Sequence, residues 1–148
     1  MTRHWLVAAV MLFVSGGSEA ACIVEPLEEH LQAADLVYVG TVVESALAVP
    51  VGGLRDGRRV DIEHTVVPQW VLKGESGIVP QVVSEAVYSD PTSGHSWKWA
   101  EAVKVSPGDS ILVVQQAEVP PRLALCTPSR RWDAETSDVV RRFFGRAP

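Results

Sequence analysis

The sequence is poor in several of the residues that most enzymes and disulfide-rich domains depend on. Its 148 residues include 2 cysteines and 4 histidines, and neither of the 2 methionines lies beyond residue 11. No hydrophobic run approaches the roughly 20 residues of a bilayer-spanning helix. Positive charge is scarce too, since the chain has 13 lysines and arginines but 18 aspartates and glutamates, which gives a net charge of −5. These deficits exclude a membrane span and a polybasic nucleic-acid binder, and a hydrophobic content of 47% excludes a disordered tail.

The motifs of the common enzyme classes are missing as well. The chain has no Gly-x-Ser-x-Gly, His-Glu-x-x-His, Walker-type loop or Gly-x-Gly-x-x-Gly. His30, His64 and His95 are far apart, and two cysteines make half of a structural zinc site. Adjacent Glu28 and Glu29 do not face each other on a helix, so they read as a solvated first turn. We therefore expect no catalytic residues, metal or cofactor, and we expect His64 to be a hydrogen-bonded, half-buried histidine.

Residues 1–20 have the pattern of a secretory signal peptide. Arg3 precedes an apolar run from Trp5 to Val14, and the small residues Ser18 and Ala20 suit a cleavage site after Ala20. The sequence thus predicts an exported protein, periplasmic or extracellular.

Cleavage there leaves residues 21–148, which is enough for a single domain. In an oxidising compartment, Cys22 and Cys126 predict one disulfide, with two unpaired buried thiols as the alternative. Closing a loop of about 100 residues stabilises a fold by roughly 4–5 kcal/mol in the loop-entropy model. A cysteine after a signal can also carry a lipid, but Glu19 stands where that processing signal has a leucine, so we expect none.

The rest of the chain favours β-structure, since residues 21–148 contain 22 valines against 9 leucines. Apolar and alternating stretches predict five strands, at about 35–44, 60–67, 78–84, 111–114 and 122–126. Short helices are expected at 26–33 and from about Asp133 to Gly145. Gly40 indicates a bulge or sharp coil in the first strand, and Pro68 an edge or bulge at the end of the second. We expect a mainly β fold, a small closed or partly closed barrel with terminal helices, with a two-sheet sandwich as the alternative.

The segment from His95 to Trp99 is the most unusual stretch of the chain. If it is extended, His95, Trp97 and Trp99 share one side, where tryptophans could anchor a protein partner or stack on a sugar. The alternative is that the tryptophans cap the open end of the barrel. The arginine pairs 130–131 and 141–142 read as solvated helix surface.

The order of several short motifs resembles a known family. An early Cys22 is followed by Ala34–Val42, Trp70–Gly74, Gly108–Val114 and Leu125–Thr127. This order is similar to that of small exported bacterial proteins related to the netrin-like domain of tissue inhibitors of metalloproteinases. The resemblance implies a five-stranded OB-like barrel whose N-terminal cysteine is tied by a disulfide to a later strand.

The resemblance also implies a function, but the sequence differs from the family pattern at two points. Members commonly have another cysteine in a region that corresponds to residues 84–106, which contain none here. In the animal inhibitors the first cysteine is the mature N-terminus and chelates the protease zinc, whereas Ala21 precedes it here. The implied function is a non-catalytic protein-binding module, with a metalloprotease among its candidate partners; a small enzyme or ligand carrier on the same barrel is the alternative. The candidate partner-binding residues are Ala21, Cys22, His95, Trp97 and Trp99.

Overall fold

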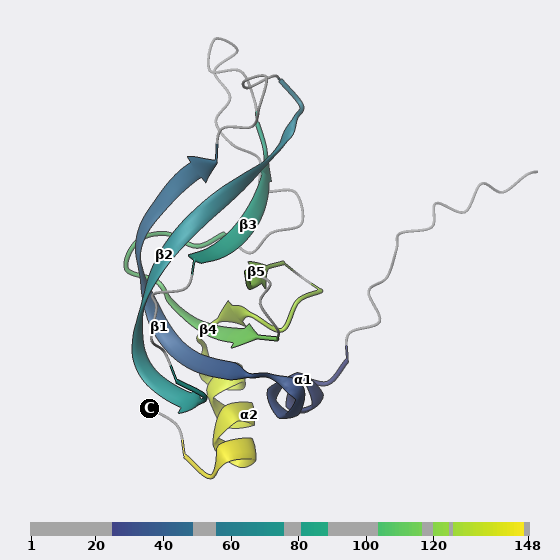
Figure 1. Cartoon of the computed structure of the whole chain (residues 1–148), viewed down its shortest axis with the longest axis vertical. Coiled ribbons are helices and arrows are strands. Elements are labelled where there is room, and N and C mark those ends of the chain that lie inside the picture. Colours follow the sequence, from purple (N-terminus) through teal and green to yellow (C-terminus); the bar gives the residue numbers. More distant parts are fainter. Residues whose placement is uncertain are drawn as a thin grey trace, which may run out of the picture.

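A computed structural model of the chain describes residues 25–48, 56–75, 81–88, 104–116, 120–124 and 126–146. Its elements are α1 (Leu27–Ala33), β1 (Leu36–Ala48), β2 (Arg59–Lys73), β3 (Gln81–Val87), β4 (Ser110–Gln115), β5 (Arg122–Leu123), β6 (Arg130–Arg131) and α2 (Ala134–Phe144). The fold is mainly β, with one helix before the strands and one after them in the sequence, as expected (Figure 1).

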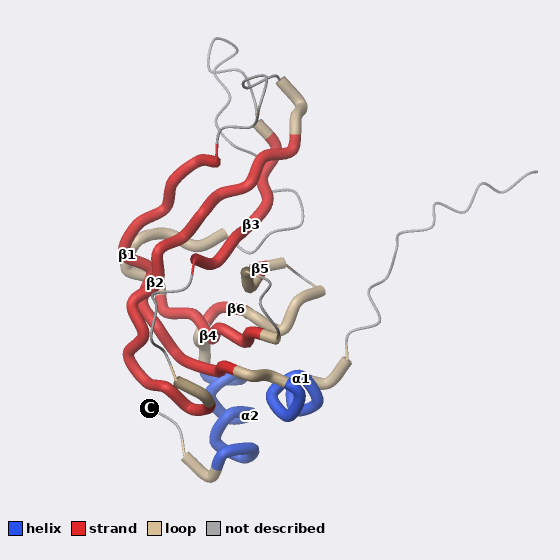
Figure 2. The backbone as a smooth tube through the Cα atoms, viewed as in Figure 1, coloured by secondary structure: helices blue, strands red, loops and turns tan. Residues whose placement is uncertain are grey.

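The six strands form one curled sheet in the order β5-β3-β2-β1-β4-β6. All neighbouring strands are antiparallel except β3 and β5, which are parallel. An isolated bridge between Leu123 and Ser129 joins the two ends of the sheet, which is thus a nearly closed barrel (Figure 2). This arrangement is consistent with an OB-like barrel.

The structure has six strands rather than five because β6 lies outside the strands expected from the sequence, and the last of those, at 122–126, is shortened to β5. Between β5 and β6 the chain turns around the side chain of Thr127. Its Oγ1 donates to the Arg122 carbonyl at 2.6 Å and accepts from the Ala124 N–H at 2.9 Å. The chain therefore leaves β3 after two residues of pairing and reaches β4 as a separate strand.

β1 lies in the centre of the sheet, and both of its faces are buried along its first half. Tyr38 and Val42 belong to the cluster that fills the barrel, whereas Val37 and Val39 face outward under the helices. The outer cluster includes Leu27, Leu31, Leu112 and Val140 from α1, β4 and α2. The strand predicted at about 35–44 is thus central, and its burial explains why its residues are apolar on both faces.

Gly40 marks the point where β1 coils tightly over β2. The register shifts between Val39 and Gly40, which lies opposite Pro68. A Cβ on Gly40 would come within 2.7 Å of Val66 Cγ1 and 2.8 Å of the Val67 carbonyl oxygen. The expected bulge is confirmed. Pro68 does not end β2, because β3 pairs with β2 only as far as Thr65, so the missing N–H of the proline removes no bond to β3.

Other strand boundaries differ from the expected ones. β1 continues four residues past Glu44, since residues 45–48 pair with β2. β2 extends from Arg59 to Lys73, well beyond the expected end at residue 67, and β3 begins at Gln81, directly after Pro80.

The C-terminal helix begins and ends where the sequence predicts. The Asp133 side chain accepts a hydrogen bond from the Thr136 N–H at 2.8 Å, and Gly145 adopts a left-handed φ of 68°. Arg130 and Arg131, expected on a helix, lie in β6 instead, where Arg131 pairs with Asp109 at 3.1 Å.

The second arginine pair does lie on the surface of α2. Arg141 pairs with Asp138 at 3.4 Å, and Arg142 pairs with Glu28 of α1 at 3.8 Å. All four side chains are largely exposed, so these pairs contribute little to stability.

Candidate functional site

Most of the site residues expected from the sequence lie outside the described residues. These are Ala21, Cys22, His95, Trp97 and Trp99. Cys126 is described, in the exposed turn that follows β5. The disulfide and the tryptophan interface therefore stay predictions, and the candidate site is built from other residues.

The strands β1, β2 and β3 continue past the barrel as a three-stranded extension. In it, Ser45–Ala48 of β1 pair with Asp61–His64 of β2, which also pair with β3. Figure 1 shows this part of the sheet running away from the two helices. Its two faces carry different chemistry, a hydrogen-bonded histidine on one and ion pairs on the other.

His64 occupies the inner face of the extension and links all three strands. Its Nδ1 is 2.8 Å from Ser45 Oγ on β1, and its Nε2 is 2.8 Å from Ser84 Oγ on β3. His64 and Ser84 are completely buried, and burial lowers the pKa of the imidazole. The prediction of a hydrogen-bonded histidine is confirmed, but His64 is fully buried rather than half-buried.

The contact between Ser45 and His64 has the spacing of a serine nucleophile and its base, but its surroundings favour a structural role. A base that accepts the proton of a serine becomes a cation, and in catalytic triads a carboxylate stabilises it. Here the second ring nitrogen of His64 meets the hydroxyl of Ser84, so a buried imidazolium would have no counter-charge in hydrogen-bond contact. The three residues therefore act as a polar tie between strands.

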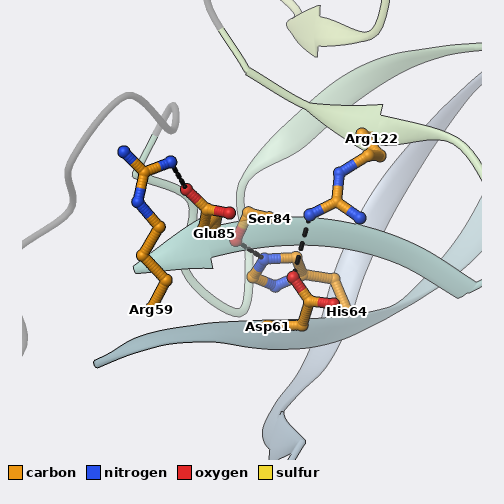
Figure 3. A network of polar contacts seen from close by, with 6 residues as sticks. All are labelled: Arg59, Asp61, His64, Ser84, Glu85 and Arg122. Carbon is orange, nitrogen blue, oxygen red and sulfur yellow. Dashed lines mark hydrogen bonds and ion pairs between the residues drawn. The ribbon is translucent and has the colours of Figure 1, made fainter. Parts of the chain in front are cut away.

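The opposite face of the extension holds two ion pairs (Figure 3). Asp61 and Glu85 lie directly opposite each other on β2 and β3, an unfavourable pairing of like charges. Arg59 binds Glu85 at 2.8 Å, and Arg122 binds Asp61 at 2.8 Å. Because Arg122 lies on β5, its side chain passes over β3 to reach β2, and so it ties the two strands together across the one between them.

Four large apolar side chains are exposed on β1 and β2; Val71, at 39%, lies opposite Tyr38 of the barrel interior, and the other three lie on the outside. Val43 is 50% exposed, Val67 39% and Trp70 51%. We call Val43, Val67 and Trp70 the outer patch. Val67 lies opposite Thr41, and Trp70 lies opposite Val39, which belongs to the helix-covered cluster. The patch thus begins where the helices stop covering the sheet.

Sequence reasoning missed this patch. Trp70 occurs in an apolar run beyond the strand expected at 60–67, and nothing in the run itself says which side chain the helices leave uncovered. Exposed aromatic residues next to a buried apolar cluster are typical of protein-binding surfaces.

The Trp70–Gly74 motif has a structural role at its C-terminal end. Lys73 Nζ donates to the carbonyl oxygens of Gln32 at 2.7 Å and Leu31 at 3.3 Å, at the C-terminus of α1. Gly74 has a left-handed φ of 77°, and a Cβ there would collide with the Asp35 carbonyl oxygen. Lys73 and Gly74 therefore dock α1 on the barrel, whereas the apolar side chains of Trp70 and Val71 at the start of the motif are exposed.

Within the described part of the chain, no group of three His, Cys, Asp or Glu side chains is placed to hold a metal ion. No helix in that part is long and apolar enough to cross a membrane. No protein-family model and no curated protein sequence matches the chain. Its function is therefore inferred from the geometry and from the sequence pattern.

Proposed function

We propose that this protein is an exported, non-catalytic module that binds another protein through the outer patch. The observation that carries the proposal is the exposure of Trp70, Val67 and Val43 on adjacent strands. Tryptophan is among the commonest anchors of protein interfaces, because it buries a large area at a low cost in side-chain entropy.

The arrangement of the polar groups supports a binding role over a catalytic one. Both ring nitrogens of His64 are engaged by serines, and the arginines on the opposite face pair with neighbouring carboxylates. These contacts stabilise the sheet and leave its outer surface for recognition. Small barrels of this kind serve as scaffolds for many binding functions, so the fold is compatible with the proposal without identifying the partner.

The proposal is tested by capture of the partner in the exported fraction. A tagged protein is cross-linked to its neighbours, purified and analysed by mass spectrometry, beside a Trp70→Ala variant. Because Trp70 is half exposed, its loss leaves the core intact, and we expect most of the specific partner to be lost. Phe143→Ala, which removes an exposed aromatic side chain from α2, is the matched control and keeps the partner. Equal recovery with both variants would contradict a role for the outer patch.

Inhibition of a zinc protease is a narrower form of the same proposal, suggested by the resemblance to the netrin-like domain. In that mechanism the α-amine of the first cysteine binds zinc, and Ala21 occupies the N-terminus after the expected cleavage. N-terminal sequencing of the exported protein should read Ala-Cys-Ile-Val. Against a panel of zinc proteases, a form that starts at Cys22 should inhibit better than one that starts at Ala21. Strong inhibition by the Ala21 form alone would rule out this mechanism.

A further inference from the structure

The outer half of β1 has a free edge. β4 pairs with β1 from Leu36 to Thr41, and the turn at Gly108–Asp109 binds the backbone of Val42. Beyond this point, residues 43–48 have β2 on one side and no described strand on the other. Residues 43–46 are exposed, and in the described part of the chain no strand covers this edge. A free edge presents unpaired backbone N–H and C=O groups that can pair with another strand.

The composition of this edge lacks the usual protection against strand addition. Between Val43 and Ala48 there is no proline or lysine, and Glu44 is the single charge. The stretch of β2 beyond Thr65 is also paired on one side among the described strands, but it contains Pro68 and ends at Lys73. The edge of β1 is therefore the better acceptor of a further strand.

Carboxylates next to this edge indicate that a strand added to it would carry positive charge. Glu44 shares the outer face with Thr65, and Ala46 shares it with Glu63 on β2. Neither Glu44 nor Glu63 has an ion pair among the described residues, whereas Asp61 and Glu85 each bind an arginine. The outer face beside the edge thus has negative charge that the described chain leaves uncompensated.

The protein itself shows how an arginine could reach the second of these carboxylates. Arg122 extends from β5 over β3 and binds Asp61 two strands away at 2.8 Å. A strand added to β1 would stand in the same relation to Glu63, with one strand between them. The side chain to be crossed there is that of Ala46, which is small and exposed.

We propose that the free edge of β1 at residues 43–48 binds an extended segment of a partner protein in which basic residues alternate with small apolar ones. The basic residues face Glu44 and Glu63, and the apolar ones lie beside Ser45 and Leu47. This is strand addition, in which backbone hydrogen bonds provide affinity and alternate side chains provide specificity. A second copy of the chain fits poorly, because it would bring another acidic edge against Glu44 and because the chain carries a net charge of −5.

The inference rests on the proposed binding function and names the chemistry of the partner. Its test uses the purified full-length exported form and a short labelled peptide in which arginine alternates with valine, followed by fluorescence anisotropy. We expect saturable binding, weakened about fivefold by Glu44→Gln combined with Glu63→Gln, as for two exposed ion pairs. Glu29→Gln, at an exposed position of α1, is the matched control and leaves the affinity unchanged.

A second peptide set tests the hydrogen-bonded geometry. N-methylation of every other residue blocks one edge of an extended peptide without changing its charge, so one of the two methylated frames should lose binding and the other should keep it. Equal binding of both frames, or no effect of the two glutamine substitutions, would overturn the proposal. So would a concentration-dependent dimer that the peptide does not dissociate. Peptide binding to the edge is measured with the purified protein and partner capture by the outer patch in the exported fraction, so failure of one proposal is observed separately from failure of the other.

Discussion

At the scale of single residues, His64 couples the stability of the three-stranded extension to pH. The imidazole is completely buried between Ser45 and Ser84, and burial lowers its pKa below the ordinary value of 6.5. Since the unfolded chain takes up a proton near pH 6.5 and the folded one does so at lower pH, the folded state loses stability as the pH falls below about 6.5.

Urea denaturation at pH 7 and at pH 5.5 measures this coupling. We expect His64 to account for a loss of up to about 1 kcal/mol over this interval. In a His64→Gln variant, which keeps hydrogen-bonding capacity but does not titrate, that part of the pH dependence should be gone. The same slope in both proteins would show that other groups cause it.

Tyr38 carries a second buried polar group, and this one has no partner among the described residues. Its side chain is 0% exposed within the barrel, its hydroxyl forms no hydrogen bond within the described part of the chain, and burial raises its pKa. An unpaired buried hydroxyl costs about 1–3 kcal/mol relative to one that is hydrated. We therefore expect Tyr38→Phe to keep or increase the midpoint of thermal unfolding, as measured by circular dichroism. Tyr88→Phe serves as the comparison, since Tyr88 is partly exposed and engaged in an interaction. A marked loss of stability in Tyr38→Phe alone would indicate that the hydroxyl has a partner in solution.

At the scale of elements, α2 depends on Asp133, the residue that caps its N-terminus. The Thr136 N–H hydrogen bond to the Asp133 carboxylate stabilises the charged form and lowers the pKa of that group. Asp133→Ala should lower the free energy of unfolding by about 1 kcal/mol, whereas Asp133→Asn should be nearly neutral because asparagine also caps well. Asp138→Ala, on the exposed side of the same helix, is the control. A loss that is as large for Asp138→Ala would mean that the cap is not the cause.

Elements whose character depends on local pattern could be predicted from the sequence. Asp133 and Gly145 mark the ends of α2, since capping chemistry is a property of single residues. The alternation from Val60 to Val66 gives the buried face of β2, because only one side of that stretch meets the core. Gly40 indicates the coil of β1, where no Cβ fits.

Features that depend on pairing between distant strands could not be predicted in this way. Residues 45–48 are mostly exposed, so they have no burial pattern, and their extended form comes from pairing with β2. The contacts of His64 with Ser45 and Ser84 join three strands. Their geometry depends on the register in which these strands pair, and the spacing of residues along the sequence does not reveal that register. The early end of β5 follows from hydrogen bonds of Thr127, which the apolar pattern does not contain.

At the scale of the whole molecule, the predicted disulfide would connect Cys22 to the region where the barrel closes. Cys126 lies between Leu123 and Ser129, the residues that bridge the two ends of the sheet. We expect mass spectrometry under non-reducing conditions to find Cys22 linked to Cys126. Reduction should lower the free energy of unfolding by roughly 4 kcal/mol in the loop-entropy model. Two thiols that react with an alkylating agent in the native, oxidised protein would contradict the disulfide.

Closure of the barrel depends on a short contact that a salt bridge reinforces. β5 pairs with β3 over Val83 and Ser84, and the Val83 N–H donates to the Pro121 carbonyl at 2.9 Å. Arg122 adds a tie from β5 across β3 to Asp61. We call this contact between β3 and β5 the seam of the barrel. Because so few contacts hold the seam, we expect it to open more readily than the long β1–β2 ladder.

The substitution Arg122→Met separates this local role from global stability. The pair of Arg122 with Asp61 is about half exposed, so its loss should lower the global free energy of unfolding by less than about 1 kcal/mol. Hydrogen exchange at the Val83 amide should nevertheless accelerate. Without the ion pair the closed contact between β3 and β5 is less stable, so it opens more often. Arg59→Met is the matched control: it breaks an ion pair of the same length to Glu85, within the continuous β2–β3 ladder, and should leave exchange at Val83 unchanged. Equal acceleration in both variants would mean that charge on the outer face, rather than the tie across β3, controls the opening of the barrel.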